Sequence, residues 1–294
     1  MRYEPAIDTT AIVALDTHVH VEIGDDGHPA LPERLTEAAT AYFGAAVHRP
    51  GLDEIADLYR SLRMAAVVFT VDAERNLGHA PNSSAAVAAG AARNNDVLIP
   101  FGSVDPLGPD PLGRARRLVE ESGVRGFKFH PTVQGFDPSD RRAYPLYDYL
   151  SGLGLPALFH TGQTGIGAGL PGGGGLRLRL SNPMLLDDVA ADFPDLAIVM
   201  AHPSVPWQDE AISIATHKTN TWIDLSGWSP RYFPEALVRA ANGRLQDRVL
   251  FGSDHPLIDP ERWLRDFAAL PMKDTVRPKI LRENALGLLG LVSA

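Results

Sequence analysis

The chain contains eight short apolar runs, and a segment with helical periodicity follows each of them. The runs lie at residues 12–20, 65–70, 98–104, 124–130, 155–161, 197–202, 221–226 and 249–253. They are continuously hydrophobic rather than alternating, as strands of a parallel sheet covered by helices must be. Eight such units in 294 residues predict an α/β fold, a (β/α)8 or TIM barrel, as a single domain over residues 1–294.

Helical segments separate the runs, and the segment at residues 52–63 places Leu52, Ile55 and Tyr59 on one face. The other segments that we expect to be helical are residues 33–47, 82–94, 111–121, 140–152, 183–192, 207–217, 232–242, 260–269 and 276–289. An open, doubly wound sheet is the alternative fold, but the glycine-rich phosphate turn that typically follows its first strand is missing. The pattern therefore favours the closed barrel.

The composition limits the chemistry that the chain can use. Because it has no cysteine, disulfides, thiolate metal sites and a cysteine nucleophile are excluded, and any metal must be bound by nitrogen and oxygen. A net charge of −9 argues against a nucleic-acid or anionic-membrane surface, so the expected partner is a small-molecule substrate. Residues 1–5 are unlike a signal peptide and no apolar run is long enough to span a membrane, so we expect a cytoplasmic protein.

Four of the apolar runs end in histidine or aspartate. The first ends in His18 and His20, and the fifth, sixth and eighth end in His160, His202 and Asp254. Alternate residues of a strand share a face, so His18 and His20 point the same way, roughly 6–7 Å apart. In a (β/α)8 barrel the strand ends meet at the face where active sites lie. A single buried histidine is more often a hydrogen-bonded core residue, but four such endings favour a shared metal site.

An ordered set of motifs extends over nearly the whole chain. It consists of residues 16–20 (Asp-Thr-His-Val-His), 126–131 (Gly-Phe-Lys-Phe-His-Pro), 160–162 (His-Thr-Gly), 201–203 (Ala-His-Pro), 252–256 (Gly-Ser-Asp-His-Pro) and 280–285 (Ile-Leu-Arg-Glu-Asn-Ala). The set resembles the amidohydrolase superfamily. More narrowly, it resembles the amidohydrolase-related branch that contains aminocarboxymuconate semialdehyde and resorcylate decarboxylases together with several hydrolases. No single motif is specific, and the resemblance rests on their order.

The resemblance implies one divalent metal ion bound by His18, His20, His160 and Asp254. Zn²⁺ suits this ligand set best, and Mn²⁺ also accepts imidazole, carboxylate and water. Three neutral imidazoles and one carboxylate leave a positively charged centre with an open position, which lowers the pKa of a bound water to about 7. The resemblance also implies that His202 shuttles protons beside the metal and that Asp254 relays a proton while bound. The alternative for His202 is a structural histidine that closes its strand.

Lys128 and His130 lie on the same face of the fourth apolar run. We favour a contact between Lys128 and a substrate anion or a water molecule. The alternative comes from other members of the superfamily, in which a carboxylated lysine on the fourth strand bridges two metals. His130 either lies beside the metal ligands or is packed in the core. Asp16, two residues before His18 on the same face, is expected to orient a ligand imidazole.

Residues 165–175 are unusually rich in glycine and follow the fifth run. They lack the Gly-Lys-Ser/Thr ending of a phosphate loop, so we expect a lid over the metal, with a surface excursion as the alternative. Arg177 and Arg179 are candidate carboxylate clamps, with ordinary surface charge as the alternative. Trp207 and Trp228 follow the sixth and seventh runs and are candidate walls of a substrate pocket, with core packing as the alternative.

Three functions fit these features. The first is a metal-dependent hydrolase that uses a metal-activated water on an ester, lactone, thioester or activated C–C bond of a small carboxylated or ring-bearing metabolite. The second is metal-dependent, non-oxidative decarboxylation of an aromatic or muconate-type acid, and the third is a barrel that binds a metal or small molecule without catalysis. The lack of long insertions and the glycine-rich segment favour hydrolysis. Analogy with the relatives suggests a homodimer.

Overall fold

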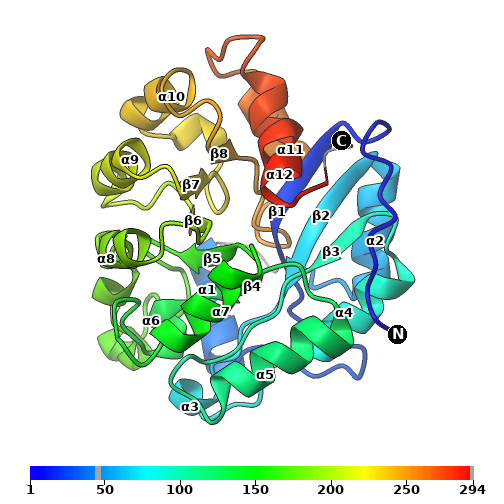
Figure 1. The fold of residues 1–294 in the computed structure, drawn as a ribbon, viewed down its shortest axis with the longest axis vertical. Helices are drawn as coiled ribbons and strands as arrows, with labels where there is room; N and C mark the ends of the chain where they lie inside the picture. Colours follow the sequence, from blue (N-terminus) through cyan, green and yellow to red (C-terminus); the bar gives the residue numbers. More distant parts are fainter. Residues whose placement is uncertain (44–47, 292–294) are drawn as a thin grey trace.

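Buried parallel strands form the centre of the computed structural model, which describes residues 1–43 and 48–291 (Figure 1). Their bounds are β1 Ala14–His20, β2 Met64–Phe69, β3 Leu98–Pro100, β4 Phe127–Phe129, β5 Ala157–His160, β6 Ile198–Ala201, β7 Thr221–Asp224 and β8 Val249–Leu250. Each pairs in parallel with the next within two groups, β1 to β3 and β4 to β8. The eight predicted strands are therefore present in the expected order.

Backbone hydrogen bonds close these two groups into one barrel. Between β3 and β4, the Lys128 N–H donates to the Gly102 carbonyl at 2.8 Å. Between β8 and β1, the Thr17 N–H donates to the Phe251 carbonyl at 2.9 Å, and the Asp254 N–H donates to the His18 carbonyl at 3.0 Å. Because all the pairs are parallel, the carboxyl ends of the strands lie at one mouth of the barrel. This is the TIM-barrel fold that the sequence predicts.

Helices surround the barrel and connect successive strands (Figure 1). Their bounds are α1 Glu33–Phe43, α2 Leu52–Ser61, α3 Glu74–Leu77, α4 Ser84–Arg93, α5 Pro111–Arg117, α6 Pro131–Gln134, α7 Tyr144–Gly152, α8 Leu185–Asp192, α9 Gln208–His217, α10 Glu235–Ala241, α11 Pro260–Ala268 and α12 Asn284–Leu288. The short helices α3 and α6, which follow β2 and β4, were not predicted. The helix predicted over residues 33–47 ends at Phe43, and residues 44–47 lie outside the described part of the chain.

Two hydrophobic layers explain why the strands are continuously apolar. Inside the barrel, strand residues such as Leu15, Val67 and Leu250 pack against Leu286 of α12. A second, larger layer fills the space between the strands and the outer helices, and it includes Tyr59 of α2. Both faces of every strand are therefore covered, as a parallel barrel requires. Since α12 packs near the start of β1, it covers the amino-terminal end of the barrel and leaves the other end for a site.

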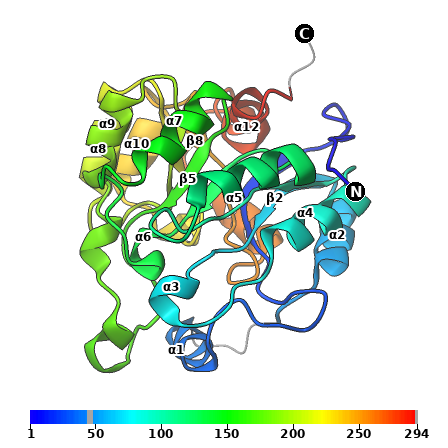
Figure 2. The same cartoon turned by 60° about the horizontal axis from the view of Figure 1, so that its bottom comes forward.

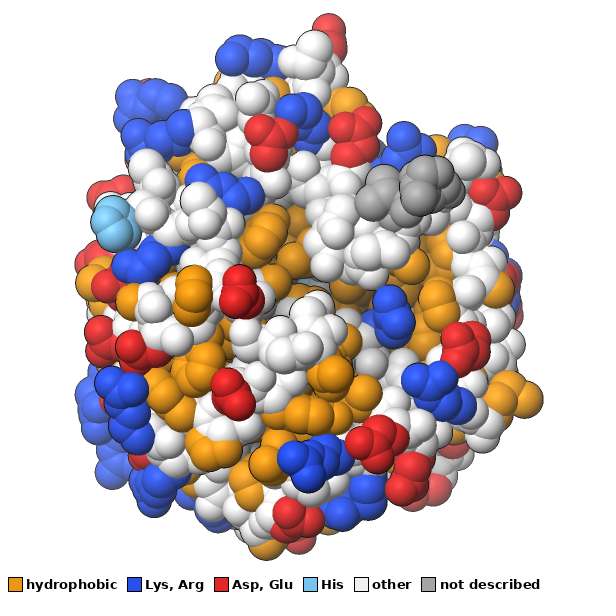
Figure 3. Space-filling model, viewed as in Figure 1, with side chains coloured by type: hydrophobic (Ala, Val, Ile, Leu, Met, Phe, Trp, Pro, Cys, Tyr) orange, Lys and Arg blue, Asp and Glu red, His pale blue; other side chains and the backbone are white. Residues whose placement is uncertain are grey.

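Helices α1, α3 and α6 lie on one side of the barrel (Figure 2), which is the side of the carboxyl ends of β1, β2 and β4. On the face drawn in Figure 3, Lys and Arg side chains are interspersed with Asp and Glu side chains. No helix within residues 1–43 and 48–291 is long and apolar enough to cross a membrane.

Candidate metal centre and cavity

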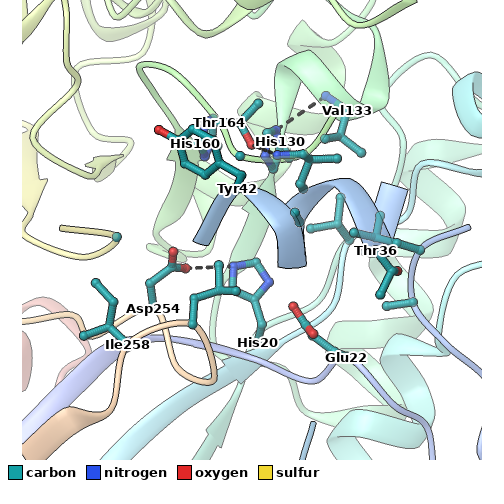
Figure 4. A pocket seen from close by; sticks show the side chains of 18 of the residues that line it. His20, Glu22, Thr36, Tyr42, His130, Val133, His160, Thr164, Asp254 and Ile258 are labelled. Carbon is teal, nitrogen blue, oxygen red and sulfur yellow. Dashed lines mark hydrogen bonds and ion pairs between the residues drawn. The ribbon is translucent and has the colours of Figure 1, made fainter. Parts of the chain in front are cut away.

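The carboxyl ends of β1 and β8 bring three of the predicted metal ligands together. The Nε2 atoms of His18 and His20 lie 3.3 Å apart, and Asp254 Oδ1 lies 3.3 Å from the first and 3.2 Å from the second. The candidate ligand atoms of all three residues lie within 4.8 Å of one another. Figure 4 shows the Asp254 carboxylate facing the His20 imidazole. One cation at this place would contact two imidazole nitrogens and a carboxylate oxygen.

The backbone is strained where β6 and β8 end. His202 and Asp254 have φ angles of 72° and 70°, in the left-handed region that costs a non-glycine residue free energy. Such strain persists only where the surrounding structure over-determines it, and it is concentrated at functional sites. Ser204, two residues after His202, has a φ of 59° as well. His202 and Asp254 are the residues to which the sequence analysis assigns proton transfer.

A carboxylate that was not predicted holds the His18 imidazole. Asp224, at the end of β7, is fully buried and its Oδ2 lies 2.6 Å from His18 Nδ1. The hydroxyl of Ser226 donates to the same oxygen at 2.9 Å. Burial raises the pKa of Asp224 to about 8, against the opposing effect of the Ser226 hydrogen bond. In its ionised form the carboxylate only accepts hydrogen bonds, so Nδ1 of His18 then carries the proton and Nε2 presents its lone pair to the cluster.

Asp16 holds the ends of β1 and β8 together. Its Oδ1 accepts from the backbone N–H groups of His18 and Ser253, both at 3.0 Å, and its Oδ2 accepts from the Tyr59 hydroxyl at 2.7 Å. The expectation that this carboxylate orients a ligand imidazole is wrong: it binds the backbone on both sides of the cluster. Burial raises the pKa of Asp16 to about 6, against the opposing effect of these hydrogen bonds.

The fourth predicted ligand, His160 at the end of β5, lies outside the three-residue cluster. Its Nδ1 lies 2.9 Å from Nε2 of His202, and its ring stacks on His130 with centroids 3.8 Å apart. With Asp224 ionised, the Ser226 hydroxyl donates to this carboxylate and accepts from Nδ1–H of His202 at 2.9 Å. Nε2 of His202 is then the acceptor for Nδ1–H of His160. The Nε2 lone pair of His160 is left for another partner.

Burial keeps these imidazoles neutral. It lowers the pKa of His18, His130 and His160 well below the ordinary value, and it lowers the pKa of His202 to about 4. The nearby Lys128 ammonium acts in the same direction on all of them. Metal ligation requires a neutral imidazole, so the environment of these residues suits ligand histidines.

A cavity of about 550 Å³ opens above the cluster. Its inner end is lined by His20, His130, His160, His202 and Asp254. Hydrophobic side chains of the loops that follow β1, β7 and β8, and of α1, make most of the remaining wall. A concave, largely apolar site with a few convergent polar groups is typical of small-molecule binding.

The protein-family comparison assigns this chain. The family model described as Amidohydrolase (Amidohydro_2) matches residues 15–291. The chain belongs to the amidohydrolase family. No curated protein matches its sequence.

Solved structures of the same fold include proteins with known ligands. The chain has a TM-score of 0.79 and 24% identity to an uncharacterised TIM-barrel protein from Bordetella bronchiseptica, over 94% of this chain and 98% of that one. It has a TM-score of 0.68 and 17% identity to 2,6-dihydroxybenzoate decarboxylase in complex with 2,6-dihydroxybenzoate, over 95% and 99% of the two chains. A third similar structure is a dihydroxybenzoic acid decarboxylase from Polaromonas with bound manganese and 2-nitroresorcinol. Its TM-score is 0.64 and its identity 16%, over 100% of this chain and 98% of that one. At these identities the comparisons establish the shared barrel.

The donor atoms of this amidohydrolase fit a divalent metal ion. Asp254 Oδ1 and His160 Nε2 are buried and have no hydrogen-bond partner in the described residues. A buried polar atom without a partner costs free energy, and a metal ion would satisfy both of these acceptors. Nitrogen and carboxylate donors suit Zn²⁺ and also Mn²⁺. The sequence-based choice of Zn²⁺ stays a prediction.

Lys128 lies beneath the cluster rather than in the cavity wall. Its Nζ is 3.0 Å from Nε2 of His18 and 4.8 Å from the ring centre of Phe69, and the side chain is fully buried. Burial lowers the pKa of Lys128 to about 7. The amine contacts the His18 Nε2 atom directly and does not line the cavity. The two sequence-based roles for Lys128, a substrate contact and a modified bridging lysine, stay predictions.

The structure separates the predicted substrate residues. Trp228 lines the cavity, whereas Trp207 is not among the cavity residues in the described chain. Arg177 and Arg179 are exposed and also lie outside the cavity lining. Only the start of the glycine-rich segment, at residues 165 and 166, reaches the cavity. Residues 171–175 instead pass beside α1, where Gly174 lies against Leu35.

Sequence reasoning missed the basic residues that do line the cavity. Arg49 and Arg262 take the places that were assigned to the two exposed arginines. Arg49 donates to Glu22 Oε2 at 2.7 Å, so its charge is paired within the wall. Neither arginine directly follows an apolar run, so no strand-end signal indicates it. Asp224 does lie near the end of such a run, at residues 221–226, and that signal could have found it.

Proposed function

We propose that this amidohydrolase-family protein is a metal-dependent, non-oxidative decarboxylase of an aromatic carboxylic acid. The observation that carries the proposal is the position of the His18–His20–Asp254 cluster and of neutral His202 at the closed end of a largely apolar cavity. The similarity to two dihydroxybenzoate decarboxylases supports it. The sequence alone favours hydrolysis, whereas the comparisons give more support to decarboxylation, which the sequence analysis gave as the alternative.

His18, His20 and Asp254 would hold a divalent metal ion, which would supply a positive charge that polarises the oxygens of the substrate. The apolar walls exclude water from the carboxylate, and loss of hydration favours its departure as neutral CO₂. The bond between the ring carbon and the carboxyl carbon breaks, its electron pair stays on the ring carbon, and a proton replaces the carboxyl group. His202 and Asp254 line this end of the cavity, and we assign the delivery of that proton to them. For His202 this requires Nε2 to exchange its contact with His160 for one with the substrate.

Hydrolysis is the second candidate, and one observation favours it. Asp254 Oδ1 is buried without a hydrogen-bond donor in the described residues, so it has capacity to accept a proton from an attacking water. The substrate would then be an ester, a lactone, a thioester or a compound with an activated C–C bond, and the product would contain an oxygen atom from solvent.

Mass balance in ¹⁸O-labelled water tests the proposal. Protein reconstituted with Zn²⁺ or Mn²⁺ is incubated with a panel of hydroxylated aromatic acids and with ester and lactone analogues. We expect one CO₂ per product and no solvent oxygen in the aromatic product, and we expect His202→Ala to reduce the rate at least about a hundredfold. Solvent ¹⁸O in the product without CO₂ would assign a hydrolase. Full activity of His202→Ala would remove this residue from the mechanism.

A further inference from the structure

Beyond the reaction type, the cavity contains a second region that the metal-centred proposal does not use. The exposure of the residues that line the cavity shows which end is the inner end and which end opens to solvent. At the inner end, His130, His160 and Asp254 have relative exposures of 3%, 5% and 6%. Tyr42 and Tyr232 also line the cavity, but their exposures are 52% and 60%. The two tyrosines therefore mark its mouth, and the cavity runs from the metal cluster outward to them.

The wall between these two ends is mostly hydrophobic, although polar residues such as Thr36, Gln163 and Thr164 also line it. We name this region the outer subsite, and its residues are Ile23, Leu31, Ala39, Tyr42, Ile166, Trp228, Tyr232, Leu257 and Ile258. Figure 4 shows that Tyr42 and Ile258 come from different elements around the same space, α1 and the loop after β8. Side chains of this kind bind an apolar body through burial and aromatic contact.

The charges in the wall do not favour a second anionic group deep in the cavity. Glu22 and Arg49 form an ion pair at 2.7 Å, so together they contribute no net charge. Arg262 lines the cavity as well, but its side chain is exposed. A second carboxylate deep in the cavity would lose its hydration against apolar side chains, and the buried part of the wall offers it only an arginine that Glu22 already pairs, which is unfavourable.

The size of the cavity excludes a single ring as its full occupant. A cavity of roughly 150 Å³ is enough for benzene, whereas this one measures about 550 Å³. A one-ring acid bound at the inner end would leave the outer subsite filled with water against hydrophobic walls. A ligand whose apolar body extends from the carboxylate to the mouth would displace that water and bury the same surface.

We propose that the substrate is a monocarboxylic acid whose carboxylate lies at the metal end and whose apolar body, of at least two rings or an equivalent chain, fills the outer subsite. This rests on the proposed function for the orientation of the carboxylate. The outer subsite then selects the substrate by apolar contact, whereas the metal end determines the reaction.

Three carboxylic acids of graded shape test the proposal in calorimetric binding experiments. Benzoate carries the carboxylate alone, biphenyl-4-carboxylate adds an apolar ring, and terephthalate adds a second carboxylate at the same position. We expect biphenyl-4-carboxylate to bind at least about tenfold more tightly than benzoate, because each buried CH₂-sized group adds roughly a factor of four. We expect terephthalate to bind more weakly than benzoate. Tighter binding of terephthalate than of biphenyl-4-carboxylate, or no binding by any acid, would overturn the proposal.

Two variants locate the effect. Tyr232→Ala removes an exposed ring at the mouth and Ile258→Ala shortens the wall, and each should reduce the gain from the second ring by at least about threefold. Tyr149→Ala on α7 is the matched control, because Tyr149 does not line the cavity. If biphenyl-4-carboxylate keeps its full gain in affinity over benzoate in both cavity variants, the second ring binds elsewhere and the outer subsite is contradicted. Thermal unfolding checks that each variant is folded.

Metal-free protein separates this inference from the proposed function. If the gain from the second ring persists after chelation but no acid is decarboxylated by the metal-loaded protein, the outer subsite stands and the reaction is wrong. If the metal-loaded protein releases CO₂ from one-ring acids and the second ring gives no gain, the reaction stands and the outer subsite is wrong.

Discussion

The two sides of the candidate metal centre are built differently. On the β1–β8 side, His18, His20 and Asp254 already converge, and Asp16 and Asp224 hold them through buried hydrogen bonds. On the β5–β6 side, His160 lies outside the cluster, stacked on His130 and hydrogen-bonded to His202. One side is a preformed group of donor atoms, whereas the other is a chain of imidazoles.

The histidines of the two sides differ in where their nitrogen atoms lie rather than in their protonation. The buried hydrogen bonds at Nδ1 leave the Nε2 atoms of both His18 and His160 as acceptors, of which His160 Nε2 has no partner in the described residues and His18 Nε2 contacts the Lys128 amine. Only the His18 Nε2 atom faces the other donor atoms. Preorganised donors bind a metal without a further cost of ordering, so the β1–β8 side should provide most of the affinity. The β5 side should complete the coordination after a small movement of His160.

The largest expected effect comes from removing one ligand on each side. Asp254→Asn should weaken Zn²⁺ or Mn²⁺ binding by more than about a hundredfold, because it removes the negative donor of the preformed cluster. His160→Ala should weaken it by only about tenfold. Competition with a chromophoric chelator measures both affinities. Equal losses in the two variants would contradict the distinction between the sides.

Asp224→Asn tests the support of the preformed side. The variant replaces the carboxylate that fixes the His18 tautomer with an amide of the same shape. Loss of such an orienting carboxylate typically weakens metal binding by about 10- to 100-fold. Asp192→Asn on α8, outside the barrel mouth, is the matched control and should bind metal as the wild type does. Unchanged affinity in Asp224→Asn would show that packing alone orients His18.

The sequence could predict the preformed side because its residues end apolar runs in a regular fold. In a parallel barrel, the end of a strand fixes where a side chain lies, so His18, His20 and Asp254 could be placed together without coordinates. Asp224 ends a strand in the same way. Its pairing with His18 could not be predicted from the sequence. Strand tilt and register determine which residues at the strand ends meet inside the barrel.

The cavity wall was predicted less well, because loops determine it. Arg177 and Arg179 follow a glycine-rich segment whose path depends on several left-handed glycines, among them Gly172 and Gly173. The structure places both arginines on the surface. Arg49, which does line the cavity, lies between α1 and α2 rather than at the end of an apolar run. A hydrophobic pattern specifies strands and core faces, but it does not specify where a loop turns.

Tyr59→Phe tests how much the buried hydrogen bonds of Asp16, which hold the ends of β1 and β8 together, contribute to stability. The variant leaves Asp16 Oδ2 buried without its donor, which should reduce the free energy of unfolding by about 1–3 kcal/mol. Urea denaturation of the metal-free protein measures the change. Tyr149→Phe, whose hydroxyl makes no hydrogen bond in the described residues, should change it by less than about 0.5 kcal/mol. Equal effects of the two variants would show that the buried hydroxyl has no special role.

A carboxylate on the surface should give the smallest effect. Asp96 accepts hydrogen bonds from Arg60 at 2.8 Å and 2.7 Å, and both side chains are partly exposed. The Arg60 guanidinium holds the pKa of Asp96 below its ordinary value. The contribution of the pair to stability is therefore present above the unfolded-state pKa of about 4. It is lost as the pH falls through the lower folded-state pKa, because the proton then neutralises the carboxylate in both states.

Asp96→Asn should accordingly reduce the free energy of unfolding by about 0.2–1 kcal/mol at neutral pH, since water and salt screen an exposed pair. The difference from wild type should shrink as the pH falls below the ordinary range of aspartate. Urea denaturation at a series of pH values measures it. The loss in the free energy of unfolding could instead be as large as that of Tyr59→Phe, or independent of pH. Either result would mean that burial does not explain the strength of the hydrogen bonds to Asp16. The rigidity of the β1–β8 side would then need a cause other than its buried hydrogen bonds.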